Sequence, residues 1–110
     1  MEITERRTAD IVTLSLSGKL DTTTAKTFET KILAQIESGD RRFIIDLAQL
    51  DYISSAGLRV FIFAGKRLNG VNGKIVLCSL KDRVREVFNI AGFTAIFSVY
   101  GSHDEATKNL

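Results

Sequence analysis

The sequence predicts an α/β domain whose mixed, mostly parallel sheet is flanked by helices. From residue 25 onward, apolar runs typical of buried strands alternate with amphipathic segments typical of helices, the pattern of parallel strands joined by helical crossovers. Two strand-like runs precede the first helix, so at least one antiparallel strand is expected near the start. The length of 110 residues fits a single domain over residues 1–110.

The first third of the chain predicts two strands and a helix. Residues 2–8 form a short polar run that suits an edge strand. Residues 11–16 alternate between apolar and mostly hydroxyl side chains, which indicates a strand with one buried face. Apolar side chains then recur at spacings of three and four, as on one face of a helix: Ala25, Phe28, Ile32 and Ile36. Asp21 or a following threonine is expected to cap this helix, and Gly39 to end it.

The rest of the chain continues the alternation. Strands are expected at residues 43–47, 74–78 and 95–100, and a turn at Asn72-Gly73. Helices are expected at residues 58–68 and 102–109, and another helix is expected to begin after a capping box at Ser79–Asp82. Parallel strands place their C-terminal ends along one edge, where ligands of open α/β sheets usually bind. We therefore expect Asp21–Thr24 and Ser54–Ser55 at the same edge.

Composition excludes several classes of function. The net charge is only +2 and the basic residues are scattered, which does not favour a nucleic-acid partner. No apolar run approaches the roughly 20 residues that cross a bilayer, so no direct membrane insertion is expected. The only cysteine, Cys78, lies in an apolar run and has no partner for an internal disulfide. A buried cysteine in a cytoplasmic protein is the expectation.

The residues of common active sites are scarce. His103 is the only histidine and lies far along the chain from both loops, so no Ser/His/Asp triad is predicted. No cluster of metal ligands, phosphate-binding glycine loop or dinucleotide fingerprint is present, and no cofactor is expected. Asp21, Asp46 and Asp51 remain a weaker alternative as converging carboxylates, since caps and turns also explain them. The chain is not expected to be an enzyme.

Ser54-Ser55 precedes a small residue and a glycine where a helix should begin. One explanation is an N-cap, worth about 1 kcal/mol. The other is a phosphorylation site, because the dipole and free N–H groups of a helix N-terminus tolerate a phosphate of about −2 charge. A partner docked on this edge would meet new charge and bulk while the fold stayed intact.

The helix after these serines predicts part of an interaction surface. With the core side formed by Leu58, Phe61, Ile62, Gly65 and Leu68, four other residues turn outward, because spacings of three and four share a face. These residues are Arg59, Val60, Phe63 and Arg67. An exposed phenylalanine and valine beside arginines are typical of protein interfaces. The alternative is a helix packed more widely, with Phe63 partly covered.

At this point the sequence resembles the STAS domain, and specifically the bacterial anti-sigma factor antagonists. The resemblance covers nearly the whole chain and rests on four segments: Gly18–Ala25, Ile45–Leu47, Leu50–Leu58 and Phe88–Phe93. The serine, small residue, glycine and leucine of Ser55–Leu58 are the most specific of these. The resemblance implies a sheet flanked by helices and a protein that acts by binding.

The resemblance also implies a mechanism. In such systems the unphosphorylated antagonist binds an anti-sigma factor serine kinase and frees a sigma factor. Phosphorylation ends the interaction, and a PP2C-type phosphatase restores it. The family's phosphorylated serine falls on Ser55, and Asp21 matches an aspartate beside the partner surface. Together with the helix analysis, this gives the expected partner-binding residues: Asp21, Thr22, Ser54, Ser55, Gly57, Arg59, Val60 and Phe63.

Two residues depart from the family pattern. Many members have aspartate directly before the phosphoserine, where this chain has Ser54, and glycine after the leucine, where it has Arg59. Arg59 adds charge to the docking face and is able to pair with a phosphate on Ser55. The alternative function is a STAS accessory subunit of a membrane transporter, without phosphorylation.

Overall fold

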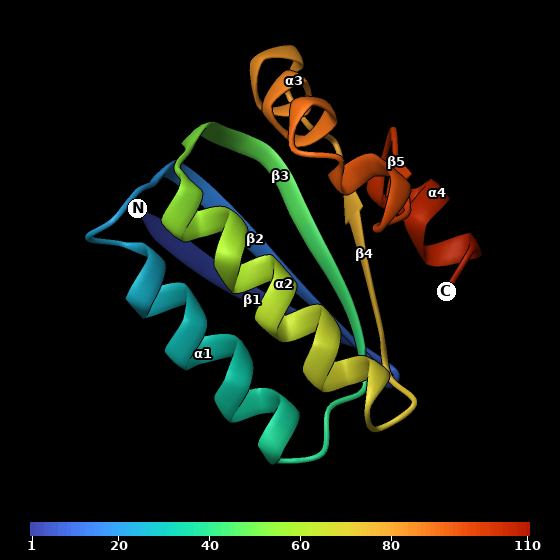
Figure 1. The fold of residues 1–110 in the computed structure, drawn as a ribbon. Helices are drawn as coiled ribbons and strands as arrows, with labels where there is room; N and C mark the ends of the chain where they lie inside the picture. Colours follow the sequence, from blue (N-terminus) through green and yellow to red (C-terminus); the bar gives the residue numbers. More distant parts are fainter.

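The computed structural model describes residues 1–110 and contains one five-stranded sheet with the order β1-β2-β3-β4-β5 (Figure 1). The strands are β1 Glu2–Thr8, β2 Ile11–Leu20, β3 Arg42–Ile53, β4 Lys74–Cys78 and β5 Val99–Tyr100. β1 pairs with β2 in antiparallel fashion, and every later pair is parallel. The predicted fold class, with its antiparallel start and mostly parallel sheet, is confirmed.

The helices are α1 Ala25–Glu37, α2 Ser55–Asn69, α3 Asp82–Ile90 and α4 His103–Lys108, with a short 3₁₀ turn, η1, at Phe93–Ala95. From β2 to β5 each strand lies beside its predecessor in sequence. Right-handed crossovers between such strands place all the connecting helices on one face of the sheet. Figure 1 shows α1 and α2 side by side, with α2 in front of β1 and β2 and α1 to their lower left, and α3 lies towards one end.

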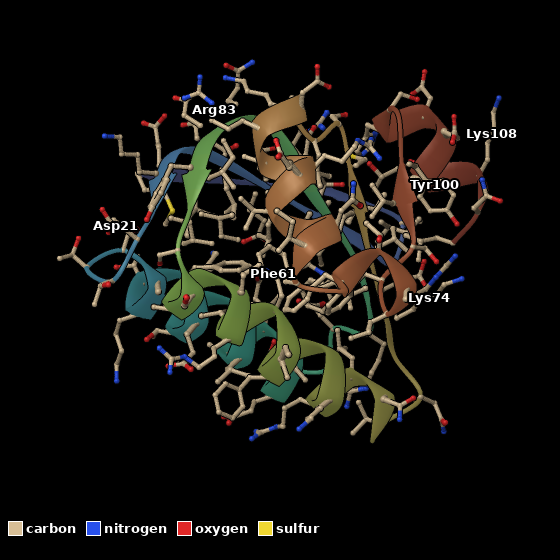
Figure 2. The ribbon with its side chains drawn as sticks, turned by 45° about the horizontal axis from the view of Figure 1, so that its top comes forward. Asp21, Phe61, Lys74, Arg83, Tyr100 and Lys108 are labelled. Atoms are coloured by element: carbon tan, nitrogen blue, oxygen red, sulfur yellow. The ribbon has the colours of Figure 1, made fainter.

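The main core fills the space between this helical layer and the sheet. Alternation in β2 buries Val12, Leu14 and Leu16 completely. The helices contribute aromatic rings, and Phe61 of α2 lies at the centre of the group (Figure 2). Its ring centroid is 5.3 Å from that of Phe28 in α1 and 5.5 Å from that of Phe88 in α3. These rings join α1, α2 and α3 into one layer, since each contributes a buried aromatic side chain to the same core.

The opposite face of the sheet carries a smaller core beneath α4. Ala106 of this helix packs with Ile44, Val76 and Cys78, all fully buried. Burial raises the pKa of the Cys78 thiol to about 11, so the predicted buried cysteine is confirmed. His103 lies on this face too, where its Nε2 is 2.8 Å from Oγ1 of Thr13. None of the helices combines the length and the apolar character needed to span a bilayer.

Two predicted local structures are wrong. Only Val99–Tyr100 of the expected strand at residues 95–100 pairs with β4. The residues before it turn instead, and the Phe97 N–H donates to the Phe93 carbonyl at 2.8 Å. The capping box at Ser79–Asp82 does not form, because Ser79 adopts a left-handed φ of 63° and the N-cap of α3 is Lys81, without a side-chain hydrogen bond.

Candidate functional site

The C-terminal ends of β2 and β3 bring the two predicted loops together. Leu20 and Ile53 are paired neighbours at the ends of these strands. The Ser54 N–H donates to the Leu20 carbonyl at 2.9 Å, which ties the start of α2 to the end of β2. Asp21 directly follows Leu20 and lies at this end of the sheet (Figure 2). The expectation that Asp21–Thr24 and Ser54–Ser55 share one edge is therefore confirmed.

Asp21 organises the turn that leads into α1. Its Oδ1 accepts hydrogen bonds from the Thr23 hydroxyl at 2.8 Å and from the N–H groups of Thr23 and Thr24 at 3.0 and 3.1 Å. The Thr23 hydroxyl first, and then the Thr24 N–H, lower the pKa of Asp21 below its usual range. The carboxylate therefore stays ionised at neutral pH, and Thr22 and Thr23 are exposed beside it.

Ser54 and Ser55 have different structural environments. Ser54 is the N-cap of α2, with extended backbone, and its Oγ accepts a hydrogen bond from the Gly57 N–H at 3.3 Å. Ser55 is the first residue of the helix and is exposed. The capping interpretation is thus confirmed for Ser54. The Ser55 hydroxyl makes no side-chain hydrogen bond and faces solvent, where it is accessible to a modifying enzyme.

Gly57 lets the first turn of α2 approach the sheet closely. A Cβ atom at this position would lie 2.8 Å from Leu20 Cγ and 3.0 Å from Ile53 Cγ1. Such distances are shorter than carbon atoms tolerate without displacement. Gly57, one of the expected partner-binding residues, is itself buried. Its role here is to position Ser54 and Ser55 against β2.

The predicted rotation of α2 is partly wrong. Val60, expected on the outer face, is only 4 % exposed, because α2 turns Gly57, Val60, Phe61, Ala64 and Leu68 towards the core. Leu58 and Ile62, expected in the core, are only half-buried. Phe63 is 53 % exposed, and Arg59 is exposed and forms no ion pair. The outward orientation of Phe63 and Arg59 is confirmed, whereas Val60 packs into the core.

A group of cations at the same edge was not predicted from the sequence. Lys81 forms an ion pair with Asp51 at the end of β3, and chiefly lowers the pKa of that carboxyl. Arg83, at the start of α3 (Figure 2), and Lys19, near the end of β2, lower this pKa further by their charge. Three cations thus surround one carboxylate. The sequence did contain a signal for this group, because Lys19, Asp51 and Lys81 each lie near or just after the end of one of three adjacent parallel strands.

The three carboxylates considered as a catalytic group do not form one site. Asp51 pairs with Lys81 and Asp21 caps the turn before α1. Asp46 lies in mid-sheet, in register with Ser15 and Cys78, and its Oδ1 accepts a hydrogen bond from the Ala48 N–H at 3.0 Å. It is seven residues before Ile53 on an extended strand, which corresponds to roughly 23 Å. Local hydrogen bonds and an ion pair therefore account for all three.

Comparisons with known proteins agree with this architecture. The sequence model of the STAS domain family matches residues 2–106. BtrV of Bordetella bronchiseptica, which is named as an anti-sigma factor antagonist, is 43 % identical over 96 % of this chain and 91 % of its own length. The anti-sigma-B factor antagonist of Listeria monocytogenes is 34 % identical over 99 % of this chain and 95 % of its own length.

Two solved structures share the fold. SpoIIAA in its unphosphorylated form superimposes with a TM-score of 0.86 at 23 % identity, over 98 % of this chain and 95 % of that chain. SpoIIAA from Bacillus in its phosphorylated form gives 0.78 at 22 % identity, over 98 % of each chain. Fold, family match and relatives lead to one conclusion: the chain belongs to the STAS domain family, and within it to the anti-sigma factor antagonists.

Proposed function

We propose that the chain is an anti-sigma factor antagonist switched by phosphorylation of Ser55. Unphosphorylated, it binds an anti-sigma factor that is also a serine kinase, and so releases a sigma factor in the cytoplasm. The kinase transfers a phosphoryl group from ATP to the Ser55 hydroxyl, which loses its proton, and ADP leaves. A PP2C-type phosphatase hydrolyses the phosphoserine and restores binding. The chain itself acts as ligand and substrate and not as a catalyst.

The division of roles between the two serines carries this proposal. The Ser54 Oγ is engaged by the Gly57 N–H, whereas the Ser55 hydroxyl is exposed and free of hydrogen bonds to other side chains. A kinase needs an accessible hydroxyl on a surface that it already contacts. Ser55 meets this requirement beside Asp21, with Phe63 and Arg59 further along the same helix.

A phosphate on Ser55 is compatible with the fold. The N–H groups of Gly57 and Leu58 are bound by Ser54, which leaves those of Ser55 and Ala56 without an intrahelical partner. These groups and the positive end of the helix dipole favour a phosphate of about −2 charge. Phosphorylation therefore changes the charge and shape of the docking surface and leaves the packing of α2 intact.

The proposed docking surface consists of exposed or half-exposed side chains at one edge of the sheet and along the outer face of α2. These are Asp21, Thr22, Ser54, Ser55, Arg59 and Phe63. Phe63 supplies an apolar anchor, and Asp21 and Arg59 supply charges of opposite sign that orient the partner. Gly57 and Val60 hold this surface in place from beneath, where both pack against the core.

Phosphorylation by the cognate kinase tests the proposal. The wild-type chain is incubated with the anti-sigma factor and ATP, and the modified residue is located by mass spectrometry. We expect one phosphate on Ser55, complete loss of labelling in Ser55→Ala, and retained labelling in the matched variant Ser54→Ala. Labelling of Ser54, or equal labelling of Ser55→Ala and wild type, would contradict the assignment. Labelling of neither serine would favour the transporter-subunit alternative.

Binding measurements test the consequence of the charge. Ser55→Asp places a carboxylate at the same helix N-terminus. By calorimetry with the kinase bound to a nucleotide that it cannot use for phosphorylation, we expect this variant to bind at least tenfold more weakly than the wild type. This difference corresponds to about 1.4 kcal/mol of binding free energy. Ser55→Asn, similar in size but neutral, is the control and should bind more tightly than Ser55→Asp. Circular dichroism should show the same fold for both. Equal affinities of the two variants would exclude charge as the basis of the switch.

A further inference from the structure

The first strand of the sheet has a free edge. β1 ends the strand order and pairs only with β2, so backbone N–H and C=O groups along its other side have no partner strand. Six of its seven residues are exposed, and the seventh, Ile3, is half-buried. The strand is longer than the average of about 5–6 residues. The edge thus offers a complete strand for further pairing.

The usual structural protection of such an edge is absent from β1. The strand contains no proline and no lysine, and its register with β2 runs from Glu2 to Thr8 without a bulge. Natural proteins use these features to keep edge strands from pairing with other chains. Charged side chains also protect an edge where a second copy would bring like charges together. Whether β1 is protected therefore depends on how its charges would meet.

Two of the four charges in β1 are already engaged within the chain. Glu5 pairs with a lysine of α1 at 2.8 Å, and Arg7 pairs with Asp40 at 2.6 Å. Glu2 and Arg6 point to the opposite face of the sheet, since side chains alternate along a strand, and neither forms an ion pair. The two free charges of the edge are thus opposite in sign and lie on the same face.

We propose that the edge of β1 binds a second copy of this chain in antiparallel fashion, with a two-fold axis at Thr4. In a symmetric antiparallel pair, opposite residues lie on the same face of the sheet, so the numbers of every opposite pair add up to the same even sum. With the axis at Thr4, Glu2 of each copy lies opposite Arg6 of the other. This register forms two ion pairs, and the two Thr4 side chains meet at the axis, which is also a favourable pairing.

The neighbouring registers lack this complementarity. An axis at Glu5 places the two Glu5 carboxylates opposite each other, and an axis at Arg6 does the same with the two guanidinium groups. An axis at Ile3 restricts pairing within β1 to residues 2–4 and places Glu2 opposite Thr4, so no ion pair forms. Charge complementarity therefore selects the axis at Thr4.

The proposed interface is short, so the dimer should be weak and reversible. Pairing about Thr4 uses residues 2–6 of each copy, and an interface of this length belongs to the low end of the size range of protein complexes. β1 contributes no residue to the proposed docking surface. The proposal is therefore independent of the phosphorylation of Ser55.

Charge reversal tests the register. Glu2→Arg and Arg6→Glu each bring like charges together at two points of the interface, and each should weaken dimerisation about tenfold. The double variant Glu2→Arg, Arg6→Glu restores opposite charges and should dimerise as the wild type does. Both residues are exposed and make no ion pair within the chain, so all three variants should fold.

Sedimentation equilibrium over a range of protein concentrations measures the dissociation constant of each dimer. A wild-type chain that stays monomeric at about 1 mM, where even a weak complex forms, would overturn the proposal. A double variant that dimerises no better than the two single variants would also overturn it.

Disulfide trapping tests the position of the axis. Thr4→Cys places two thiols directly opposite each other, with Cβ atoms about 4.5–5.5 Å apart, and should form a covalent dimer on mild oxidation. Thr8→Cys is the matched control, because Thr8 is exposed on the same face of β1 but lies outside the paired residues. Cys78 is buried and does not compete. Equal crosslinking of the two variants, or crosslinking of Thr8→Cys alone, would contradict an axis at Thr4.

Discussion

Gly57 is the position where the smallest possible side-chain change should have a measurable effect. In Gly57→Ala the new methyl group would lie 2.8 Å from Leu20 Cγ, 2.9 Å from Leu20 Cδ2 and 3.0 Å from Ile53 Cγ1. Leu20 is fully buried and Ile53 is 4 % exposed, so neither can swing into solvent. Overpacking of this kind costs about 1–3 kcal/mol. Alanine regains up to about 1 kcal/mol as the better helix former. With a central cost of about 2 kcal/mol for overpacking, we expect a net loss of about 1 kcal/mol.

Urea unfolding of Gly57→Ala and Gly70→Ala separates the two contributions. Gly70 has a φ of −68°, and a Cβ atom there would meet nothing closer than the Arg67 carbonyl at 3.5 Å. Gly70→Ala should therefore raise the urea midpoint. The free energy of unfolding should increase by about 0.4–1 kcal/mol, because alanine lowers the conformational entropy of the unfolded chain. Gly57→Ala should lower it with an unchanged m-value. A Gly57→Ala protein as stable as the wild type would refute the close approach of α2 to β2.

Two further predictions concern stability. Ser54→Ala should lower the free energy of unfolding by about 1 kcal/mol through loss of the N-cap. Ser55→Ala should change it by less than about 0.5 kcal/mol. Equal effects of the two substitutions in urea unfolding would contradict the assignment of the cap to Ser54 alone. Arg7 donates to both carboxylate oxygens of Asp40, at 2.6 and 3.0 Å, and lowers the pKa of this carboxyl. The ionised pair therefore stabilises the fold above the usual aspartate pKa of about 3.9, and this contribution is lost as the pH falls through the lowered folded value. Asp40→Asn should be less stable than the wild type at neutral pH and lose less stability on acidification, measured as urea midpoints; parallel pH profiles would rule the pair out as a source of the acid sensitivity.

Elements with a single regular period could be predicted from the sequence. Val12, Leu14 and Leu16 alternate with hydroxyl side chains, and only one face of such a strand can be buried. The stripe of Phe28, Ile32 and Ile36 likewise allows one orientation of α1. Both orientations are confirmed, because all six side chains are at most 4 % exposed.

The rotation of α2 could not be predicted in the same way. Apolar residues occupy most positions from Leu58 to Ala64, so two rotations of the helix bury a similar amount of hydrocarbon. The contact of Gly57 with Leu20 selects one of them and turns Val60 inward. That contact joins segments far apart in sequence, and helical periodicity alone does not encode it.

At residues 95–100, where the predicted strand is wrong, the sequence contains two competing signals. Ile96 and Val99 favour a strand by their β-branched side chains. Phe93 and Phe97, however, are four residues apart, the spacing of one helical turn, and both are buried with their ring centroids 5.6 Å from each other. Packing of these rings against Phe88 and Phe61 outweighed the local strand preference.

The candidate site was predictable where it depends on strand order. Residues that follow the ends of β2 and β3 meet at one edge in any parallel pair, so Asp21 and Ser55 could be placed together. The cations around Asp51 could not, because Lys19 belongs to β2 whereas Lys81 and Arg83 lie at the start of α3, and they meet only through the spacing of the strands.

The anchoring of the first turn of α2 has a consequence for how fast the proposed switch can respond. The Ser54 cap, the hydrogen bond from Ser54 to Leu20 and the contact of Gly57 with β2 fix this turn in the free protein. A preformed surface needs no ordering step before binding, so association can proceed at the rates of rigid proteins, about 10⁵–10⁷ M⁻¹s⁻¹. The response time of the switch would then depend on how fast the complex dissociates and on how fast the kinase and the phosphatase turn over. Cells could adjust this response time through the abundance of the two enzymes.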